Sequence, residues 1–173
     1  CSVRRQRQMC IRDRLFSAEG MKGNIGGVIL FDETIRQNSA TGTPLVDLIV
    51  TQGALPGIKV DKGLKPIEGL EENLTQGLEG LDERLKEYYD LGAKFTKWRA
   101  VINIGKDLPS EAAISANMEA LASYAKIVQD NKMVPMFEPE VLMDFDHTIE
   151  ACFEVTSMCL DYHFSNLHKS GVN

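Results

Sequence analysis

The sequence predicts an α/β protein whose parallel sheet is part of a (β/α)8 barrel of the TIM type. Segments with the pattern of buried strands alternate with segments of helical periodicity, an order typical of parallel sheets with right-handed crossovers. Three predicted strands also end in two ionisable residues spaced two apart, and strand alternation places both side chains of each pair on one face. The sequence contains neither a glycine-rich dinucleotide turn nor a P-loop motif, which disfavours a doubly wound sheet.

The first predicted strand is the continuous apolar run of residues 25–31 (IGGVILF), the pattern of a strand covered on both faces. A loop rich in Gly, Thr and Pro follows to about residue 46, and the next strand runs from Gly57 to Asp61. Thr75 is then expected to cap a helix that ends near Leu91 and Gly92. The apolar stripe of that helix consists of Leu78, Leu81, Leu85 and Tyr88.

The same order then repeats twice. Residues 94–102 are a predicted strand, Ser110 is expected to cap a helix, and Asn131 with Lys132 ends it. The stripe of this helix is Ile114, Met118, Leu121, Ala125 and Val128. Residues 134–138 are the next strand, and a last helix is expected from about Asp146 to His168, with Gly171 just past its end. Its apolar side is expected to consist of Ile149, Cys152, Phe153, Thr156, Cys159 and Leu160.

The size of the chain matches only part of a barrel. Four strands with three or four helices make about half of an eight-stranded barrel, which usually has about 250 residues. We therefore expect a chain that is incomplete at both ends, with two open sheet edges and an uncovered apolar face. Such a piece should be poorly soluble and should unfold with little cooperativity when produced alone.

Composition and charge narrow the class of protein. The chain has 173 residues, 43% of them hydrophobic, and a formal net charge of −6. Residues 1–14 carry five arginines against one aspartate, so the body is more acidic than the whole chain, which argues against nucleic acid as a partner. The sequence contains no membrane-length apolar run and its start does not resemble a secretory signal. We expect a cytoplasmic protein, with the plastid as an open alternative.

Cysteines and histidines give no sign of a disulfide framework or a metal centre. Cys152 and Cys159 lie about 10 Å apart along a helix axis, too far to bridge. His147, His163 and His168 have no matched thiol or carboxylate cluster and are expected to be solvated or packed between helices. The prediction is therefore no metal and no cofactor.

Six ionisable residues at the strand ends are the candidate site. They are Lys59 and Asp61, Lys97 and Arg99, and Glu138 and Glu140. A closed parallel sheet would gather all six at its C-terminal rim, where barrel enzymes hold their active sites. Three positive and three negative charges favour a compensated pocket with tuned pKa values over a simple anion trap.

Each of these residues has a functional and a structural interpretation. Lys97 and Arg99 could bind phosphate groups, or they could be solvated side chains at the end of a strand. Trp98 lies between them and is expected to pack against the helices. Glu138 ends an apolar strand, where partial burial would make its carboxyl group a usable general acid or base. Glu140 could take part in the chemistry directly or balance charge beside it. Lys59 and Asp61 could belong to the site or form only a structural ion pair.

Several segments together resemble one enzyme family. GGVILFDET, GIKVDKG, TQGLEGLDERLKEYYDLGAKFTKWR and VPMFEPEVLMDFDH are similar to class I, Schiff-base-forming fructose-1,6-bisphosphate aldolases, and the resemblance runs from about Leu15 to Asn173. It implies strands 2–5 of the barrel and a metal-free, typically homotetrameric lyase of glycolysis and gluconeogenesis. That enzyme cleaves fructose 1,6-bisphosphate reversibly into dihydroxyacetone phosphate and glyceraldehyde 3-phosphate.

The resemblance also implies roles for individual residues. Lys97 and Arg99 match the substrate contacts of the family, and Lys59 belongs to the same polar cluster, with Asp61 as polar support. Glu138 matches the residue that handles proton transfers during Schiff-base formation, with Glu140 supporting it electrostatically. The Schiff-base lysine of the family lies on the sixth strand in an L-K-P context and has no match within residues 1–173. Lys65 has a similar context, but it follows the GIKVDKG strand and is expected in a loop.

The resemblance implies a domain boundary and an alternative function. Residues 1–13 match no part of the family pattern and are interpreted as a separate basic segment, either an artefact of sequence assembly, a targeting arm or an RNA-contacting tail. Residues 14–173 are the incomplete barrel domain. We expect an internal fragment that is inactive alone; a non-catalytic sugar-phosphate-binding fragment is the alternative, and another Schiff-base or phosphosugar barrel enzyme is a third.

Overall fold

The computed structural model of the chain describes residues 10–144 and 146–172, and its main sheet is parallel. The four strands are β1 (Gly27–Leu30), β2 (Leu55–Lys59), β5 (Phe95–Ile102) and β6 (Val134–Val141), which lie in the order β1-β2-β5-β6. Crossover helices α4 (Leu81–Asp90) and α5 (Glu111–Asp130) follow β2 and β5, and α6 (Ile149–Lys169) follows β6. Neighbours in sequence are thus neighbours in space, as in a barrel wall, and the predicted α/β class is confirmed.

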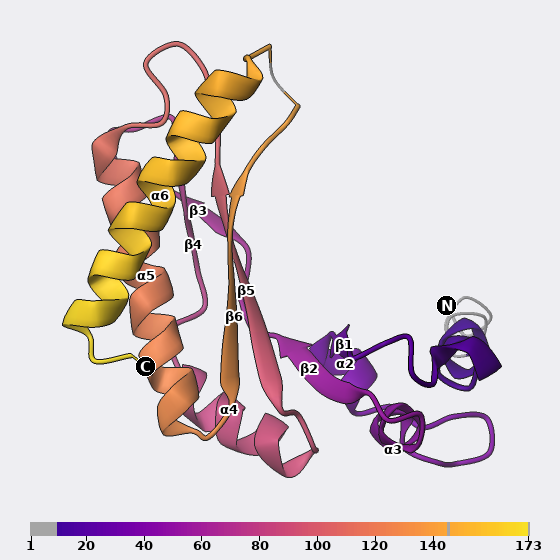
Figure 1. Cartoon of the computed structure of the whole chain (residues 1–173). Helices are drawn as coiled ribbons and strands as arrows, with labels where there is room; N and C mark the ends of the chain where they lie inside the picture. The colour runs from indigo at the N-terminus through magenta and orange to yellow at the C-terminus, as the bar shows by residue number, and fades with distance from the viewer. Residues whose placement is uncertain (1–9, 145, 173) are drawn as a thin grey trace.

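Helices cover one face of the sheet. Figure 1 shows α5 and α6 side by side along the long strands β5 and β6. Along β5, Thr96 and Trp98 point to the helices and are fully buried, whereas Lys97 and Arg99 point to the opposite face and are partly exposed. The ring centroids of Trp98 and Tyr124 lie 5.2 Å apart. The predicted division into a packed Trp98 and an open Lys97–Arg99 face is therefore confirmed.

Close packing between strands requires glycine at one position of β2. A Cβ added to Gly57 would lie 2.3 Å from the ring of Phe95, its partner on β5. The Phe95 ring can therefore lie over β2 only because position 57 has no side chain.

The strand and helix ends differ in part from the sequence prediction. β2 begins at Leu55 and ends at Lys59, so Asp61 follows the strand, and β6 extends to Val141 and includes Glu140. The segment expected to be a loop up to residue 46 contains α2 (Asp32–Ile35), and α3 (Leu45–Thr51) overlaps its end. A 3-10 turn, η1 (Glu19–Met21), precedes β1.

The predicted cap at Thr75 is wrong. Thr75 ends β4 (Asn73–Thr75), which pairs with β3 (Leu64–Pro66) in an antiparallel hairpin. Helix α4 begins at Leu81 after Gly80, whose φ of 60° is in the left-handed region that glycine tolerates. The hairpin is attached to α5 by the buried Asn117, which accepts the Thr75 N–H at 3.3 Å and donates to the Asn73 carbonyl at 2.9 Å. Buried polar groups of this kind need partners, which explains why Thr75 belongs to the hairpin.

The long helices begin and end close to the predicted residues. The Ser110 side chain caps α5 by accepting the Ala113 N–H at 3.2 Å, as predicted, and Thr148 caps α6 in the same way at Ala151. After α6, Gly171 has a φ of 65°, and the Val172 N–H donates to the Leu167 carbonyl, which makes a Schellman ending.

The predicted apolar side of α6 is wrong for most of its members. The residues of α6 that are buried are Cys159, His163 and Leu167, whereas Phe153 is 71% exposed and Ile149 is also exposed. The helix carries apolar residues on more than one side, so periodicity could not decide which side faces α5 and β6. His163 packs its ring edge-on against Phe137 of β6, with 4.2 Å between centroids, which agrees with the expected helix-packing role.

The predicted basic segment 1–13 is described only in part. Residues 1–9 lie outside the described residues, and residues 10–16 are helical. Arg12 donates to the Gln37 side chain at 2.7 Å, and Asp13 accepts the Ala40 N–H at 3.0 Å. The domain boundary at residue 13 stays a prediction.

None of the described helices is both long enough and apolar enough to cross a bilayer.

Candidate active site

The face of the sheet opposite α5 and α6 has an apolar end and a charged end. Strand pairing places Leu55, Val134 and Met136 toward the amino ends of the strands, and all three are exposed. The six predicted site residues follow toward the carboxyl ends. The register pairs Lys59 with Lys97 and Arg99 with Glu138, so these side chains share one face. The structure therefore brings the predicted residues together on one face, with Lys59 and Asp61 at the end of β2, Glu138 and Glu140 in the second half of β6, and Lys97 and Arg99 within β5 rather than at its end.

Lys59 and Asp61 form an ion pair at the end of β2. The Asp61 side chain is only 6% exposed, and its Oδ2 atom is buried without a hydrogen-bond partner. Lys59 is the charged group that compensates this carboxylate. The pairing that the sequence left open is thus present, within the charged cluster itself.

The other two ion pairs join β5 to β6. Lys97 Nζ lies 2.5 Å from Glu138 Oε2, and the Arg99 guanidinium donates to the Glu140 carboxylate. The hydrogen bond to Glu140 raises the pKa of Arg99 above its ordinary value, against a smaller opposing effect of burial. The Glu138 side chain is 44% exposed, so it is more open than the apolar strand before it suggested. Cations and carboxylates thus alternate across the open face.

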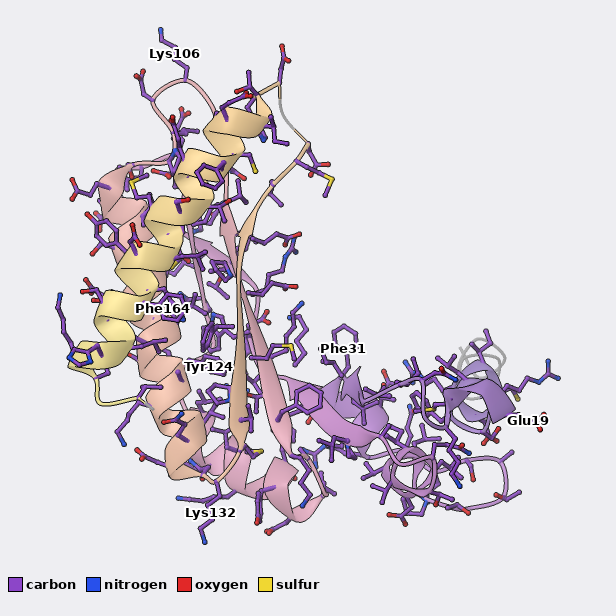
Figure 2. All side chains as sticks on the ribbon, in the orientation of Figure 1. Glu19, Phe31, Lys106, Tyr124, Lys132 and Phe164 are labelled. Carbon is purple, nitrogen blue, oxygen red and sulfur yellow. The ribbon has the colours of Figure 1, made fainter. Side chains whose placement is uncertain are left out.

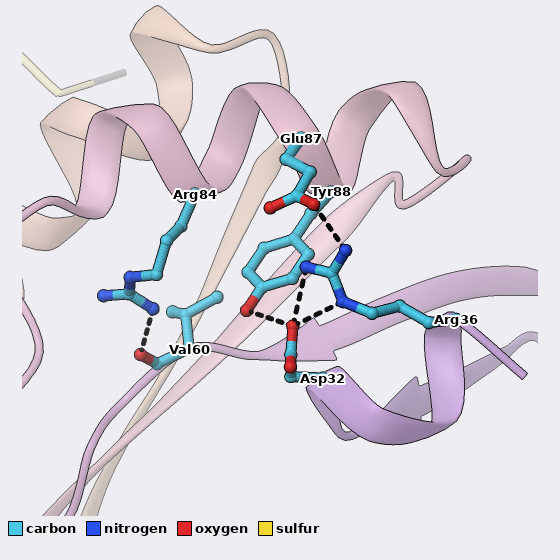
Figure 3. Close-up of polar contacts among 6 residues, drawn as sticks. All are labelled: Asp32, Arg36, Val60, Arg84, Glu87 and Tyr88. Atoms are coloured by element: carbon cyan, nitrogen blue, oxygen red, sulfur yellow. Dashed lines mark hydrogen bonds and ion pairs between the residues drawn. The ribbon is translucent and has the colours of Figure 1, made fainter.

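A pocket of about 500 Å³ adjoins Lys59 and Asp61 between α2 and α4. In Figure 3, Asp32 of α2 accepts from Arg36 at 2.9 Å and from the Tyr88 hydroxyl at 3.0 Å. The bond from Arg36 holds the pKa of Asp32 below its usual value, whereas burial raises the pKa of Tyr88. Arg36 also bonds Glu87, so α2 and α4 are joined at the edge of the site.

Arg84 completes this wall of the pocket. Its guanidinium donates to the main-chain carbonyl of Val60 at 3.0 Å and to that of Gly77, fixing the chain on both sides of the β3–β4 hairpin. Sequence reasoning missed Arg84 and the Asp32 network. The local sequence pattern gave no signal for these contacts, because most of the bonded partners are far apart in the chain. Arg84 lies 24 residues from Val60, and Tyr88 lies 56 residues from Asp32.

The remaining sequence candidates lie elsewhere or stay untested. Lys65 belongs to β3, the exposed strand of the hairpin, so its expected place in a loop is wrong. Cys159 is buried and Cys152 partly so, and burial raises the pKa of the Cys159 thiol to about 11. Among residues 10–144 and 146–172, no group of three His, Cys, Asp or Glu side chains could hold a metal ion. The prediction of a metal-free protein stays a prediction.

Comparison with known proteins identifies the family. The model of the glycolytic class-I fructose-bisphosphate aldolase family matches residues 3–173. The chain belongs to the class-I fructose-bisphosphate aldolase family. This confirms the resemblance carried by the strand-end motifs.

Aldolases from bacteria and plants are similar to the chain over most of its length. A probable fructose-bisphosphate aldolase class 1 from Xanthomonas campestris pv. campestris is 51% identical over 162 residues, which cover 93% of this chain and 48% of that protein. The cytosolic fructose-bisphosphate aldolase 6 of Arabidopsis thaliana is 50% identical, over 87% of this chain and 42% of that protein. The chain thus spans about half the length of the curated relatives it matches.

A solved aldolase has the same fold over this region. The fructose-bisphosphate aldolase of Plasmodium falciparum, in complex with TRAP and a small-molecule inhibitor, superimposes with a TM-score of 0.91 at 47% identity. The match covers 94% of this chain and 48% of that protein. The four parallel strands of this aldolase chain are therefore a partial barrel, as the sequence predicted.

Proposed function

We propose that the protein is a fructose-bisphosphate aldolase of glycolysis and gluconeogenesis. It would cleave fructose 1,6-bisphosphate reversibly into dihydroxyacetone phosphate and glyceraldehyde 3-phosphate by a Schiff-base mechanism. Family membership supports this activity, and one structural observation carries it: three cation–carboxylate pairs lie together on the open face of the parallel sheet. The cytosolic relative from Arabidopsis supports a cytoplasmic location, and the homotetramer typical of the family is the assembly we propose.

The charged residues of this chain divide into substrate contacts and proton carriers. Arg99 offers a planar fork to a phosphate group, and Lys97 and Lys59 offer point charges. Glu138, held by Lys97, is the group we assign to proton transfer. Glu140 keeps Arg99 compensated, and Asp61 does the same for Lys59. A bound phosphate would replace these carboxylates in part as partners of the cations.

The covalent chemistry needs a neutral lysine amine. The amine adds to the ketose carbonyl to give a carbinolamine, which loses water to give an iminium. The electrons of the carbon–carbon bond then pass into the iminium to give an enamine, and the aldehyde leaves. Glu138 would supply the proton for the departing water and would take back the proton of the hydroxyl group whose carbon becomes the aldehyde. Protonation of the enamine and addition of water to the resulting iminium then release dihydroxyacetone phosphate and the free lysine amine. We assign the nucleophile to none of Lys59, Lys65 and Lys97, because Lys59 and Lys97 are ion-paired and Lys65 lies on the exposed strand β3.

Reductive trapping tests the proposal. The full protein encoded with this chain is incubated with dihydroxyacetone phosphate and borohydride, and the modified peptide is located by mass spectrometry. We expect one stable adduct, on a lysine other than Lys59, Lys65 and Lys97. If no adduct forms, the Schiff-base mechanism is rejected; if the adduct forms on Lys65, our assignment of that residue is rejected.

The second candidate is a non-catalytic sugar-phosphate-binding protein. The observation in its favour is that all three ion pairs of the charged face are complete within this chain. Binding of fructose 1,6-bisphosphate that is lost in Lys97→Ala, with no turnover and no trapped adduct in the full protein, would favour this reading.

A further inference from the structure

The hydroxyl group of Tyr124 joins two strands from behind the candidate active site. Tyr124 extends from α5 into the layer between the helix and the sheet and is fully buried (Figure 2). Its hydroxyl lies 2.6 Å from Thr96 Oγ1 of β5 and donates to the main-chain carbonyl of Met136 of β6 at 3.2 Å. A tyrosine hydroxyl has one hydrogen, and the carbonyl can only accept, so Thr96 is the donor in the shorter bond. The result is a chain of hydrogen bonds from β5 through Tyr124 to β6.

This link lies directly behind the Lys97–Glu138 ion pair. Thr96 precedes Lys97, and Met136 lies two residues before Glu138, within the part of the ladder where Lys97 pairs with Met136. Because neighbouring residues of a strand point to opposite faces, Tyr124 holds the rear of the two strands and the ion pair spans their front. Burial raises the pKa of Tyr124, so the hydroxyl stays protonated and keeps its donor.

We propose that Tyr124 is a positioning residue that sets the separation and register of Lys97 and Glu138. Its importance for turnover rests on the proposed function, whereas the positioning itself does not. A 2.5 Å contact between two flexible side chains depends on where their backbones lie, and a displacement of about 1 Å is enough to disable a site of this kind. Tyr124 fixes those backbones through Thr96 and Met136, without contacting the substrate face.

A purely structural role is the competing interpretation. The Tyr124 ring also packs against Trp98, so its loss could weaken the core without affecting the ion pair. Tyr124→Phe removes only the hydroxyl group and keeps this packing. Thr96→Val combined with Tyr124→Phe removes both side-chain partners of the short bond, which should restore much of the stability because no buried hydroxyl is then left unpaired.

The two interpretations are separated by a zero-length crosslink. A carbodiimide joins Lys97 to Glu138 as an amide with loss of one water, and the yield, measured by mass spectrometry well below the unfolding temperature, reports how often the two groups meet. The internal reference is the pair Lys86 and Asp82 on α4, whose ammonium and carboxylate groups also lie 2.5 Å apart. This pair lies away from Tyr124, which belongs to α5. Tyr162→Phe is the matched control, because its hydroxyl bonds Glu111 at an exposed position.

We expect Tyr124→Phe to lower the ratio of the two crosslinks about fivefold, which corresponds to about 1 kcal/mol at 25 °C. Tyr162→Phe should leave the ratio unchanged, and the Thr96→Val, Tyr124→Phe double variant should regain stability without regaining the ratio. An unchanged ratio in Tyr124→Phe, or a ratio that recovers together with stability in the double variant, would overturn the proposal. No substrate is used, so failure here is distinct from failure of the aldolase assignment.

Discussion

Lys59 and Lys97 are register partners on β2 and β5, and both side chains lie on the open face of the sheet. Two ammonium groups on adjacent strands repel each other, and each is compensated by its own carboxylate, Asp61 for Lys59 and Glu138 for Lys97. Without these carboxylates the arrangement would cost stability. A bound anion placed between the two ammonium groups would also compensate their charge.

Asp61→Asn should destabilise the chain more than a comparable change at a surface pair. The substitution leaves Lys59 beside Lys97 without its partner, at a carboxylate position that is almost completely buried, and we expect a loss of about 1–3 kcal/mol in the free energy of unfolding. Asp130→Asn is the control, because its pair with Lys126 is exposed and should contribute less than about 0.5 kcal/mol. Urea unfolding of both variants, made in the full protein encoded with this chain, measures the difference. Equal losses in the two variants would contradict our view that Asp61 compensates the repulsion between Lys59 and Lys97.

Ser110→Ala should cost more than Thr148→Ala, although both residues cap a helix. Each cap accepts one main-chain N–H at 3.2 Å, and losing that bond should cost about 1 kcal/mol. The Ser110 hydroxyl also bonds the buried carboxylate of Glu72, which anchors the β3–β4 hairpin and would lose a partner. Ser110→Ala should therefore lose about 1 kcal/mol more in the free energy of unfolding. Similar losses for the two variants would show that the Ser110 hydroxyl does not stabilise the buried Glu72 carboxylate.

His163 should make the stability of the chain fall in mild acid. Burial lowers its pKa in the folded state, and the main-chain carbonyl of Met118 opposes this only in part. The unfolded chain therefore binds the proton more readily, and stability that is complete above the unfolded pKa of about 6.5 is lost as the pH falls toward the lower folded value. His163→Met should flatten the fall in unfolding free energy between about pH 7 and pH 5, whereas the exposed His168→Gln should not. Parallel curves for all three proteins would contradict this assignment.

The sequence predicted the parts of the fold that depend on local periodicity. Alternation along residues 94–102 correctly separated Trp98 from Lys97 and Arg99, and Ser110 was recognisable as a cap because its bond reaches only three residues. The role of Thr75 could not be found in this way, because its partner Asn117 lies 42 residues away. Long-range packing, rather than propensity, decides such positions.

The sequence indicated which six charged side chains lie together on the open face, but it indicated neither their connections nor the neighbouring contacts of Asp32 and Arg84. Strand-end spacing selected all six charged residues, yet the pairing of Arg99 with Glu140 depends on the β5–β6 register, which no single strand encodes. Tyr124 was missed for the same reason, since Thr96 and Met136 become its neighbours only when α5 folds over the sheet. The buried side of α6 was also undetermined, because Phe153 and His163 lie on different sides of a helix that is apolar around much of its circumference.

Calorimetric titration of fructose 1,6-bisphosphate into the full protein encoded with this chain tests most directly whether the open charged face is a sugar-phosphate site. Lys97→Ala and Arg99→Ala each remove one cation from that face, whereas Lys94→Ala removes one that lies over the Tyr89 ring before β5 begins. We expect measurable binding that weakens about tenfold or more in the first two variants, as for the loss of a charged hydrogen bond, and stays unchanged in the third. Binding that is absent in the unsubstituted full protein, or equally strong in all four proteins, would contradict this assignment.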